Sequence, residues 1–240
     1  MICFGIESAG KTASVAIWKD TGLLYEATLR AGFTHSESLM EMIDTALKAV
    51  HLTAKDIDLW GVCAGPGSFT GLRIGLAAVK GLAFACNAPC VAVSTLEAHA
   101  WTTCGIETVI PALDARRGQV YAAAFSAPKD GNPPVRQMED GAYPVEELKD
   151  FVISCKKPLV FVGDGAEICY NSYETISGVL RWPKFLSDGK AVGVCLAAME
   201  QAKNGLTQTG EELRPCYHRL SQAERERMEK LTNQQKSEGQ

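Results

Sequence analysis

The chain has 240 residues, of which 46% are hydrophobic and 22% charged, and its net charge is −4. This composition is typical of a globular protein and excludes a collagen, a coiled coil and a wholly disordered chain, and no uninterrupted apolar run reaches the roughly 18–20 residues of a membrane span. The basic residues are scattered, so the sequence does not predict a protein that holds nucleic acid on its own.

The N-terminus and the cysteines both favour a cytoplasmic location. Residues 1–7 have neither the basic region nor the apolar core of a secretory signal. The nine cysteines are odd in number and irregularly spaced, with no Cys-x-x-Cys pair. We therefore expect reduced, structural thiols rather than a zinc or disulfide site.

The first half of the chain predicts a three-stranded meander followed by alternating helices and strands. Alternating apolar residues indicate strands, and apolar residues at three-and-four spacing indicate helices. Ser94 and Glu97 have the spacing of a capping box and mark the start of a third helix. The expected strands are residues 2–7, 14–18, 23–29, 57–64 and 91–94, and the expected helices are 36–50 and 71–85. This order is typical of a ribonuclease-H-like lobe.

After Gly105 the pattern starts again, which predicts a second lobe. Residues 109–114 and 120–126 read as a hairpin, 145–153 and 191–203 as helices, and 159–162 as a strand ended by Gly163-Asp-Gly165. We expect an α/β fold of two ribonuclease-H-like lobes, the second eroded. The expected divisions are 1–104 for the first lobe, 105–220 for the second, and 221–240 for a charged, partly disordered C-terminal helix or tail.

Residues 5–12 match the phosphate-loop expression G-x-x-x-x-G-K-[ST]. That loop needs a strand before it and a helix after it. Here Gly5 already lies inside the expected first strand, and residues 12–18 alternate as a second strand. We therefore interpret Gly10 and Lys11 as part of a β-hairpin.

A second glycine-rich loop, residues 65–71, follows the strand at 57–64. Ligands bind beyond the carboxyl ends of strands in open α/β sheets, so Gly67, Ser68 and Arg73 are weak candidates for phosphate binding. An ordinary strand–loop–helix junction explains the loop equally well. The helix that follows holds several glycines, each costing roughly 1 kcal/mol relative to alanine, so either the lobe's own sheet or a second subunit must approach it closely.

Ordinary catalytic constellations are missing from the sequence. The four histidines are far apart, and no Cys–His pair stands at a recognisable spacing. Asp114, at the end of an apolar strand and followed by Arg116 and Arg117, is either a site carboxylate or a member of a strand-end ion pair.

Several strings occur in a recognisable order over the first half of the chain. The most specific are Gly65-Pro-Gly-Ser-Phe-Thr-Gly-Leu-Arg73 and Asp114-Ala-Arg-Arg-Gly118, and His35-Ser-Glu-x-Leu39 and Val93-Ser-Thr-Leu-Glu-Ala98 agree with them. Together they resemble the TsaB (YeaZ) family, in the glycoprotease-like (peptidase M22-type) group that includes TsaD and Kae proteins. The second half matches in outline.

The resemblance implies the actin/Hsp70-like ATPase (ASKHA) fold and a part in forming N6-threonylcarbamoyladenosine next to the tRNA anticodon. It implies a non-catalytic subunit that binds and activates a catalytic TsaD-like paralogue as a heterodimer, assisted by a TsaE-like ATPase. The tRNA is then held only through the complex, and no membrane is involved. A homodimer is the alternative when the partner is missing.

The same resemblance implies that this chain has no catalytic residue, metal or cofactor of its own, because ATP and metal belong to the partner subunits. The catalytic paralogue carries Val-His-His-x-Glu-x-His, whose two histidines at i and i+4 hold a metal. The corresponding string here runs from Val93 to His99, with Thr95 in place of the first of these histidines. Glu7 also replaces the aspartate usual in the family. The alternative reading is an independent enzyme of the same fold, a metallopeptidase or a small-molecule kinase.

The helices at 36–50 and 71–85 form the partner surface in the family that this chain resembles. An apolar stripe with an adaptable methionine, together with small residues that permit close approach, suits a helical bundle. The alternative is that these residues serve the chain's own core. The interface candidates are Leu39, Met42, Ile43, Leu47, Gly75, Ala78 and Leu82.

Overall fold

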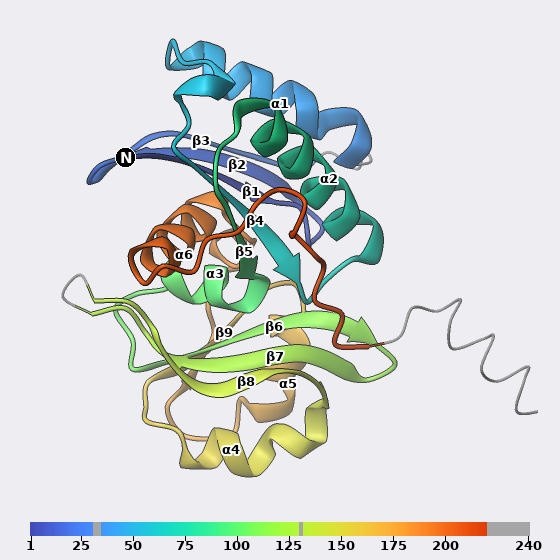
Figure 1. Ribbon diagram of the computed structural model, residues 1–240. Helices are drawn as coiled ribbons and strands as arrows, with labels where there is room; N and C mark the ends of the chain where they lie inside the picture. The colour runs from blue at the N-terminus through green and yellow to red at the C-terminus, as the bar shows by residue number, and fades with distance from the viewer. Residues whose placement is uncertain (31–34, 130–131, 220–240) are drawn as a thin grey trace, which may run out of the picture.

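Two five-stranded sheets with the same topology organise the chain (Figure 1). The computed structural model describes residues 1–30, 35–129 and 132–219. Within them the first sheet has the order β3-β2-β1-β4-β5 and the second the order β10-β9-β6-β7-β8. In each sheet three antiparallel strands precede two parallel ones. The prediction of two ribonuclease-H-like lobes is confirmed. The second lobe is reduced relative to the first, because its last strand, β10, has two residues.

The strands of the first sheet are β1 (Ile2–Glu7), β2 (Ala13–Lys19), β3 (Gly22–Leu29), β4 (Leu59–Gly65) and β5 (Cys90–Ser94). The strands of the second are β6 (Thr108–Arg116), β7 (Gln119–Ser126), β8 (Val135–Pro144), β9 (Leu159–Val162) and β10 (Val179–Leu180). The α-helices are α1 (His35–Ala49), α2 (Phe69–Cys86), α3 (Thr95–Trp101), α4 (Lys149–Ser154), α5 (Ala166–Tyr173) and α6 (Ala191–Lys203). Short 3-10 turns are η1 (Ala54–Asp56), η2 (Val145–Leu148) and η3 (Lys184–Leu186).

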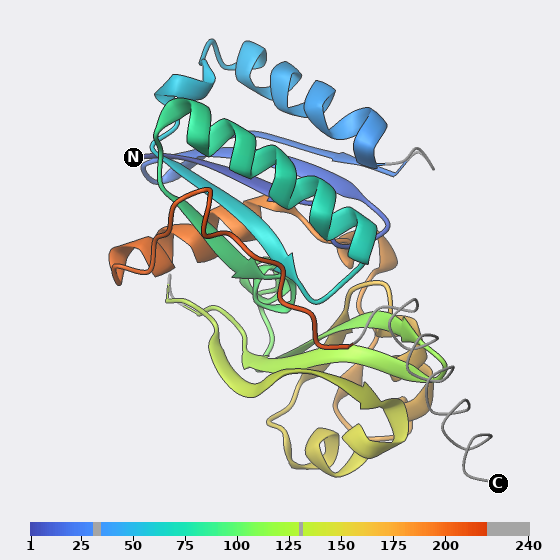
Figure 2. The ribbon, with the colours of Figure 1, turned by 45° about the vertical axis from the view of Figure 1, so that its right-hand side comes forward.

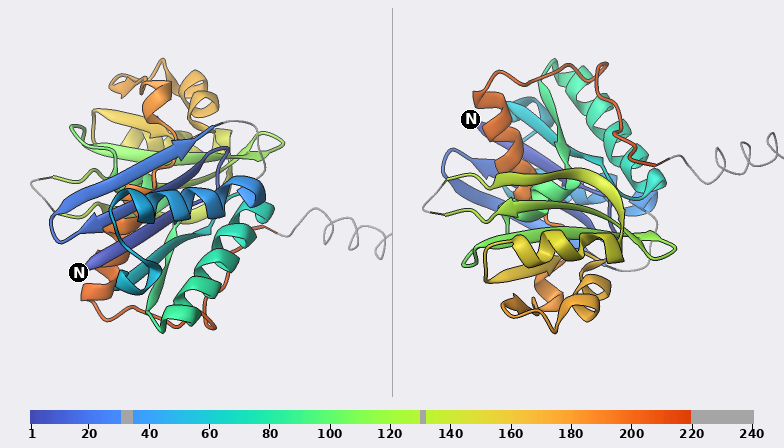
Figure 3. Two further views of the ribbon diagram at one scale, coloured as in Figure 1. Left: turned by 90° about the horizontal axis from the view of Figure 1, so that it is seen from above. Right: turned by 90° about the horizontal axis from the view of Figure 1, so that it is seen from below.

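The helices lie in three layers around the two sheets. Helices α1 and α2 cover the outer face of the first sheet and α4 lies on the outer side of the second, as the views from above and below show (Figure 3). Helices α3 and α6 lie between the sheets (Figure 1). Helix α5 packs against β9 and β6 in the core of the second lobe. Each sheet is therefore covered on both faces, which is why its central strands are almost wholly apolar.

The assignment of residues 105–220 to the second lobe is wrong for its last part. Helix α6 packs on β1, β2, β4 and β5 of the first sheet. The sheet admits the helix because a Cβ at Gly5 would meet the Ala191 carbonyl oxygen at 2.5 Å, and a Cβ at Gly61 would meet the Ala198 Cβ at 2.9 Å. The expected tail, residues 221–240, lies outside the described residues.

Three elements of the second lobe have no counterpart among the sequence predictions: β8, α5 and β10. β8 contains Gly141 and ends at Pro144, and both residue types disfavour strands. It forms because it pairs along most of its length with β7. Long-range pairing therefore overrides a poor local propensity here.

Helix α2 is the one helix in the described part of the chain that is long and apolar enough to cross a membrane. Length and composition are weak evidence for a span, because the core helix of a soluble protein has the same character. Leu72, Leu76, Val79 and Ala83 of this helix are buried against the first sheet.

A segment without regular structure, residues 204–219, continues from α6 across both lobes (Figure 2). We call it the strap. Gln208 pairs with Cys90 at the start of β5, and Leu213 is fully buried in the core of the first lobe. At its end, Arg219 Nη1 donates a hydrogen bond of 2.8 Å to the Ala115 carbonyl of the second lobe. The strap therefore ties the two lobes together.

Candidate functional site

A cleft of about 570 Å³ lies at the junction of the two lobes. The turn that follows β1 contributes Lys11, and the loop that follows β9 contributes Asp164. Carboxyl ends of strands are where open α/β sheets bind ligands. We call this the interlobe cleft, and its further lining residues include Arg30, Tyr170, Arg181, Trp182, Lys184 and Asp188.

The cations of the interlobe cleft already have partners. Lys11 Nζ lies 3.4 Å from Asp164 Oδ2, and Lys184 Nζ lies 3.6 Å from Glu167 Oε2. Arg30 forms an ion pair with Asp188. The Arg181 guanidinium lies 4.7 Å from the centre of the Tyr170 ring.

A polyphosphate in this cleft would have to compete with these contacts for the cations. Binding a triphosphate requires cations or free backbone amides aimed at its oxygens. Here the three cationic ammonium and guanidinium groups of Lys11, Arg30 and Lys184 are neutralised by carboxylates of the same cleft. Those carboxylates would also repel the ligand.

Glu7 ends β1 and is 1% exposed. Its Oε1 accepts hydrogen bonds from the Ala9 and Gly10 amides at 2.7 and 3.2 Å, while Oε2 has no hydrogen-bond partner among the described residues. Burial raises the pKa of Glu7 to about 7, against the lowering effect of the two amides. Asp164 and Asp188 add a smaller rise in the pKa. Near neutral pH the Glu7 carboxyl group is therefore protonated in a substantial fraction of the molecules.

Helix α3 places Thr95 and His99 one turn apart, and both are buried. Burial lowers the pKa of His99 to about 4, although Asp164 and Asp188 act in the opposite direction. The imidazole is therefore neutral at ordinary pH. Within the described ranges, no three His, Cys, Asp or Glu side chains converge as metal ligands.

The phosphate-loop match at residues 5–12 is a β-hairpin, as interpreted from the sequence. β1 pairs antiparallel with β2 from Ile2 to Glu7, and no helix follows the turn. Gly5 is required for the packing of α6 and not for a phosphate.

The weak phosphate candidates Gly67, Ser68 and Arg73 do not line the interlobe cleft. The Ser68 amide donates a hydrogen bond of 2.8 Å to the Ala9 carbonyl, and its hydroxyl accepts from the Gly71 amide and caps α2. Arg73 Nε donates to the Tyr217 hydroxyl at 2.8 Å. The loop is packed against the β1–β2 turn, so the strand–loop–helix junction is the reading that the contacts support.

Asp114 is the strand-end carboxylate of the second lobe. Its Oδ1 accepts a hydrogen bond of 2.7 Å from the Arg116 amide, and its own amide donates to Asp164 Oδ1 at 2.9 Å. Arg116 Nη1 lies 4.0 Å from Asp114 Oδ2. Asp114 therefore shapes the β6–β7 turn. The sequence did not single out Asp164 or Asp188, although the Gly163-Asp-Gly165 string at the end of a strand was the available signal.

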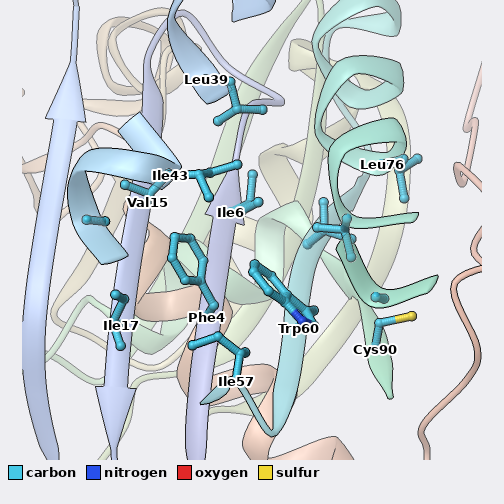
Figure 4. Close-up of a cluster of buried hydrophobic side chains, with 14 of the residues drawn as sticks. Phe4, Ile6, Val15, Ile17, Leu39, Ile43, Ile57, Trp60, Leu76 and Cys90 are labelled. Carbon is cyan, nitrogen blue, oxygen red and sulfur yellow. The ribbon is translucent and has the colours of Figure 1, made fainter. Parts of the chain in front are cut away.

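Four of the interface candidates are buried in the chain's own core. Leu39, Ile43 and Leu47 are 1%, 2% and 9% exposed and pack with the side chains of β1, β2 and β4, as Figure 4 shows for Leu39 and Ile43. A Cβ at Gly75 would meet Ser8 Oγ at 2.3 Å. The assignment of these four to a partner surface is wrong. Met42, Ala78 and Leu82 are half-buried against the same core.

The exposed sides of α1 and α2 face away from the first sheet, and the two helices lie side by side over it (Figure 2). Met40 is 53% exposed and Phe84 is 73% exposed. We call this surface the helical face. It consists of Ser36, Glu37, Met40, Glu41, Asp44, Thr45 and Lys48 of α1, and Thr70, Arg73, Ala77, Gly81, Phe84 and Ala85 of α2.

Comparisons with known proteins give a consistent result. Residues 30–226 match the family TsaD, tRNA N6-adenosine threonylcarbamoyltransferase. The tRNA threonylcarbamoyladenosine biosynthesis protein TsaB of Escherichia coli K12 is 34% identical over 139 residues, 55% of this chain and 58% of that protein. TsaB of Bacillus subtilis 168 is 32% identical over 126 residues, 52% and 55% of the two chains. The chain thus spans little more than half the length of the curated relatives that it matches.

Two solved structures share the fold. One is an uncharacterized protein with similarity to peptidase YeaZ from Pseudomonas aeruginosa, with a TM-score of 0.76 and 23% identity over 91% of this chain and 99% of that chain. YeaZ from Pseudomonas aeruginosa has a TM-score of 0.72 and 23% identity, over 90% and 99% of the two chains. The two-lobed fold expected from the sequence is confirmed.

Proposed function

Because the chain belongs to the TsaD family of tRNA N6-adenosine threonylcarbamoyltransferases, we propose that it takes part in forming threonylcarbamoyladenosine on tRNA. Its similarity to proteins named for that biosynthesis supports this assignment. Its part is that of a non-catalytic subunit in the cytoplasm, which binds and activates a catalytic TsaD-like subunit and works with a TsaE-like ATPase.

The observation that carries the non-catalytic part is the charge pairing of the interlobe cleft. Lys11, Arg30 and Lys184 are each paired with a carboxylate of the same cleft, and Arg181 is stacked on Tyr170, so a nucleotide would have to displace these contacts. The net charge of −4 likewise gives the chain alone few contacts for tRNA. The tRNA is then bound by the assembled complex.

The partner surface is the helical face. It offers one large apolar side chain from each helix, Met40 and Phe84, and the exposed small residues Ala77 and Gly81 of α2. In the family that the chain resembles, these two helices contact the catalytic subunit, and Met40 and Phe84 are the large apolar side chains that they expose here.

The proposal is tested by co-purifying the chain with the catalytic paralogue from the same genome. Met40→Glu with Phe84→Glu should abolish the heterodimer and the tRNA modification while the melting temperature stays unchanged, because both side chains are exposed. Phe185→Glu is the matched control, since Phe185 is 78% exposed on the second lobe. Normal pairing by the double variant would place the interface elsewhere. Metal-dependent peptide cleavage or ATP turnover by the lone chain would instead support an independent enzyme.

A further inference from the structure

A second groove lies between the C-terminal end of α2 and the strap. Its volume is about 480 Å³, and it shares no lining residue with the interlobe cleft. The strap is held in place along it, because the Gln208 and Cys90 backbones exchange two hydrogen bonds of 2.9 Å. A Cβ at Gly210 would meet the Lys80 carbonyl oxygen at 3.0 Å, so the strap also touches α2 directly. We call this the strap groove, and it is lined by Ala83, Phe84, Asn87, Ala88, Pro89 and residues 207–212.

Phe84 connects the strap groove to the helical face. Its side chain is 73% exposed, and it belongs to both surfaces. Ala83, Ala88 and Pro89 complete the apolar wall beside it. A partner that covers the helical face at Phe84 therefore reaches the groove as well.

The strap groove is negatively charged. Of the described residues that line it, the two charged ones are Glu211 and Glu212. Glu212 Oε2 accepts hydrogen bonds from the Thr209 amide and hydroxyl at 2.8 and 3.0 Å, and these bonds lower the pKa of the Glu212 carboxyl group. Glu211 is exposed, and its carboxylate has no ion-pair partner among the residues that the structure describes. The C-terminal end of α2 adds the negative end of the helix dipole.

The nearby cation does not neutralise this charge from within the groove. Arg214 is not a lining residue, and its Nη1 donates hydrogen bonds to the backbone carbonyls of Glu211 and Leu213. The groove thus combines an exposed aromatic ring, an apolar wall and an unpaired carboxylate.

We propose that the strap groove binds an arginine side chain of the catalytic subunit, an inference that rests on the proposed function. A guanidinium can stack on the Phe84 ring and pair with the Glu211 carboxylate, while the aliphatic stem of the arginine covers the apolar wall. Arginine is also one of the side chains that contribute most to binding at protein interfaces. A lysine fits less well, because its ammonium is a compact, strongly hydrated charge that does not stack.

Charge reversal at Glu211 tests the groove in the heterodimer itself. We expect Glu211→Lys to weaken binding of the catalytic subunit about tenfold, because it brings like charges together. Glu211→Gln should weaken binding less and make the affinity less sensitive to salt. Glu174→Lys is the matched control, since Glu174 is an exposed residue at the end of α5 in the second lobe. Titration calorimetry at several salt concentrations measures these affinities, and thermal melts show that each variant is folded.

A double-mutant cycle tests whether Phe84 and Glu211 bind the same group. Phe84→Leu removes the aromatic ring and keeps an apolar side chain. Glu211→Gln should have a smaller effect in the Phe84→Leu background than in the wild-type background, because the guanidinium is then already less well held. Strictly additive effects would overturn the shared site.

The outcomes separate this inference from the proposed function. A catalytic subunit that binds Glu211→Lys as tightly as it binds wild type and Glu174→Lys would overturn the groove and leave the proposed function intact. Failure of the wild-type chain to bind the catalytic subunit would overturn both. An Arg→Glu substitution in the catalytic subunit that restores binding to Glu211→Lys would identify the bound side chain, and rescue by Lys→Glu alone would overturn the choice of arginine.

Discussion

At the scale of single residues, Glu7 and His99 are two buried groups that have opposite effects on how the stability of the fold depends on pH. Burial raises the pKa of Glu7 from 4.5 to about 7, so between these values the folded state holds a proton that the unfolded state has lost. Acidification through that range stabilises the fold. Burial lowers the pKa of His99 from 6.5 to about 4, so acidification through that range favours the unfolded state. Each shift corresponds to about 3 kcal/mol at most.

We therefore predict that Glu7→Gln exposes a pH dependence that the wild-type protein largely cancels. In the variant, Glu7 no longer opposes the His99 effect, so the free energy of unfolding should fall as the pH is lowered from about 6.5 to about 4. His99→Gln should show the opposite slope between pH 4.5 and 7. Urea unfolding at a series of pH values measures both. If Glu7→Gln and wild type had the same pH profile, the assigned shift of the Glu7 pKa would be wrong.

At the scale of elements, the glycines of α2 serve two different purposes. A Cβ at Gly75 would meet Ser8 Oγ at 2.3 Å, and Ser8 donates a hydrogen bond of 2.9 Å to the Gly71 carbonyl. A Cβ at Gly81 would meet nothing within 4 Å. One glycine is therefore required by the contact between α2 and the end of β1, and the other only weakens the helix.

The same substitution at these two positions should have opposite effects. We expect Gly75→Ala to lower the free energy of unfolding by about 1–3 kcal/mol, because Ser8 must move. Gly81→Ala should raise it by about 0.5–1 kcal/mol through helix propensity and a less flexible unfolded chain. Thermal or urea unfolding of the pair decides the matter. A stabilising Gly75→Ala would show that the contact with Ser8 is not tight in solution.

At the scale of the whole molecule, the two lobes are joined by buried contacts on several sides of α3. Ala98 packs in the cluster that contains α6, whereas Leu96 and Ala100 pack with β6, β7 and β9. The Ser94 hydroxyl, at the end of the first sheet, donates a hydrogen bond of 2.6 Å to Asp140 Oδ2 of β8. Asp140 also pairs with Arg136, and Lys11 reaches Asp164 across the cleft. These contacts favour unfolding as one cooperative unit.

Asp140→Ala should therefore weaken the junction of the lobes. It removes the partner of the Ser94 hydroxyl and of the Arg136 guanidinium, and we expect a loss of about 2 kcal/mol. Glu139→Ala is the neighbouring control, because the Glu139 side chain is 87% exposed and lies 4.0 Å from Arg136, and such pairs contribute less than about 1 kcal/mol. Calorimetry should show one unfolding transition for the wild-type protein and one at a lower temperature for Asp140→Ala. Two separate transitions in the wild-type protein would contradict the shared core.

The sequence by itself determined the local features of the fold, which are the strands, turns and helix starts that depend on residues close together in the chain. Period-two alternation placed the strands of both hairpins, and the alternation after Gly10 excluded a phosphate loop, because the conformation of a short segment follows its own apolar spacing. Ser94 and Glu97 marked the start of α3 for the same reason, and the Ser94 hydroxyl accepts from the Glu97 amide as that spacing requires.

Only the tertiary structure decided which surface each side chain faces. The spacing of Leu39 and Ile43 is the same for a helix that packs on its own sheet and for one that packs on a partner, and only the position of the first sheet beneath α1, with β2 nearest to it, buries them. Helix α6 follows the second sheet in the chain yet lies on the first, because Gly5 and Gly61 leave room for it there. Such contacts join residues far apart in sequence, so no local sequence pattern predicts them.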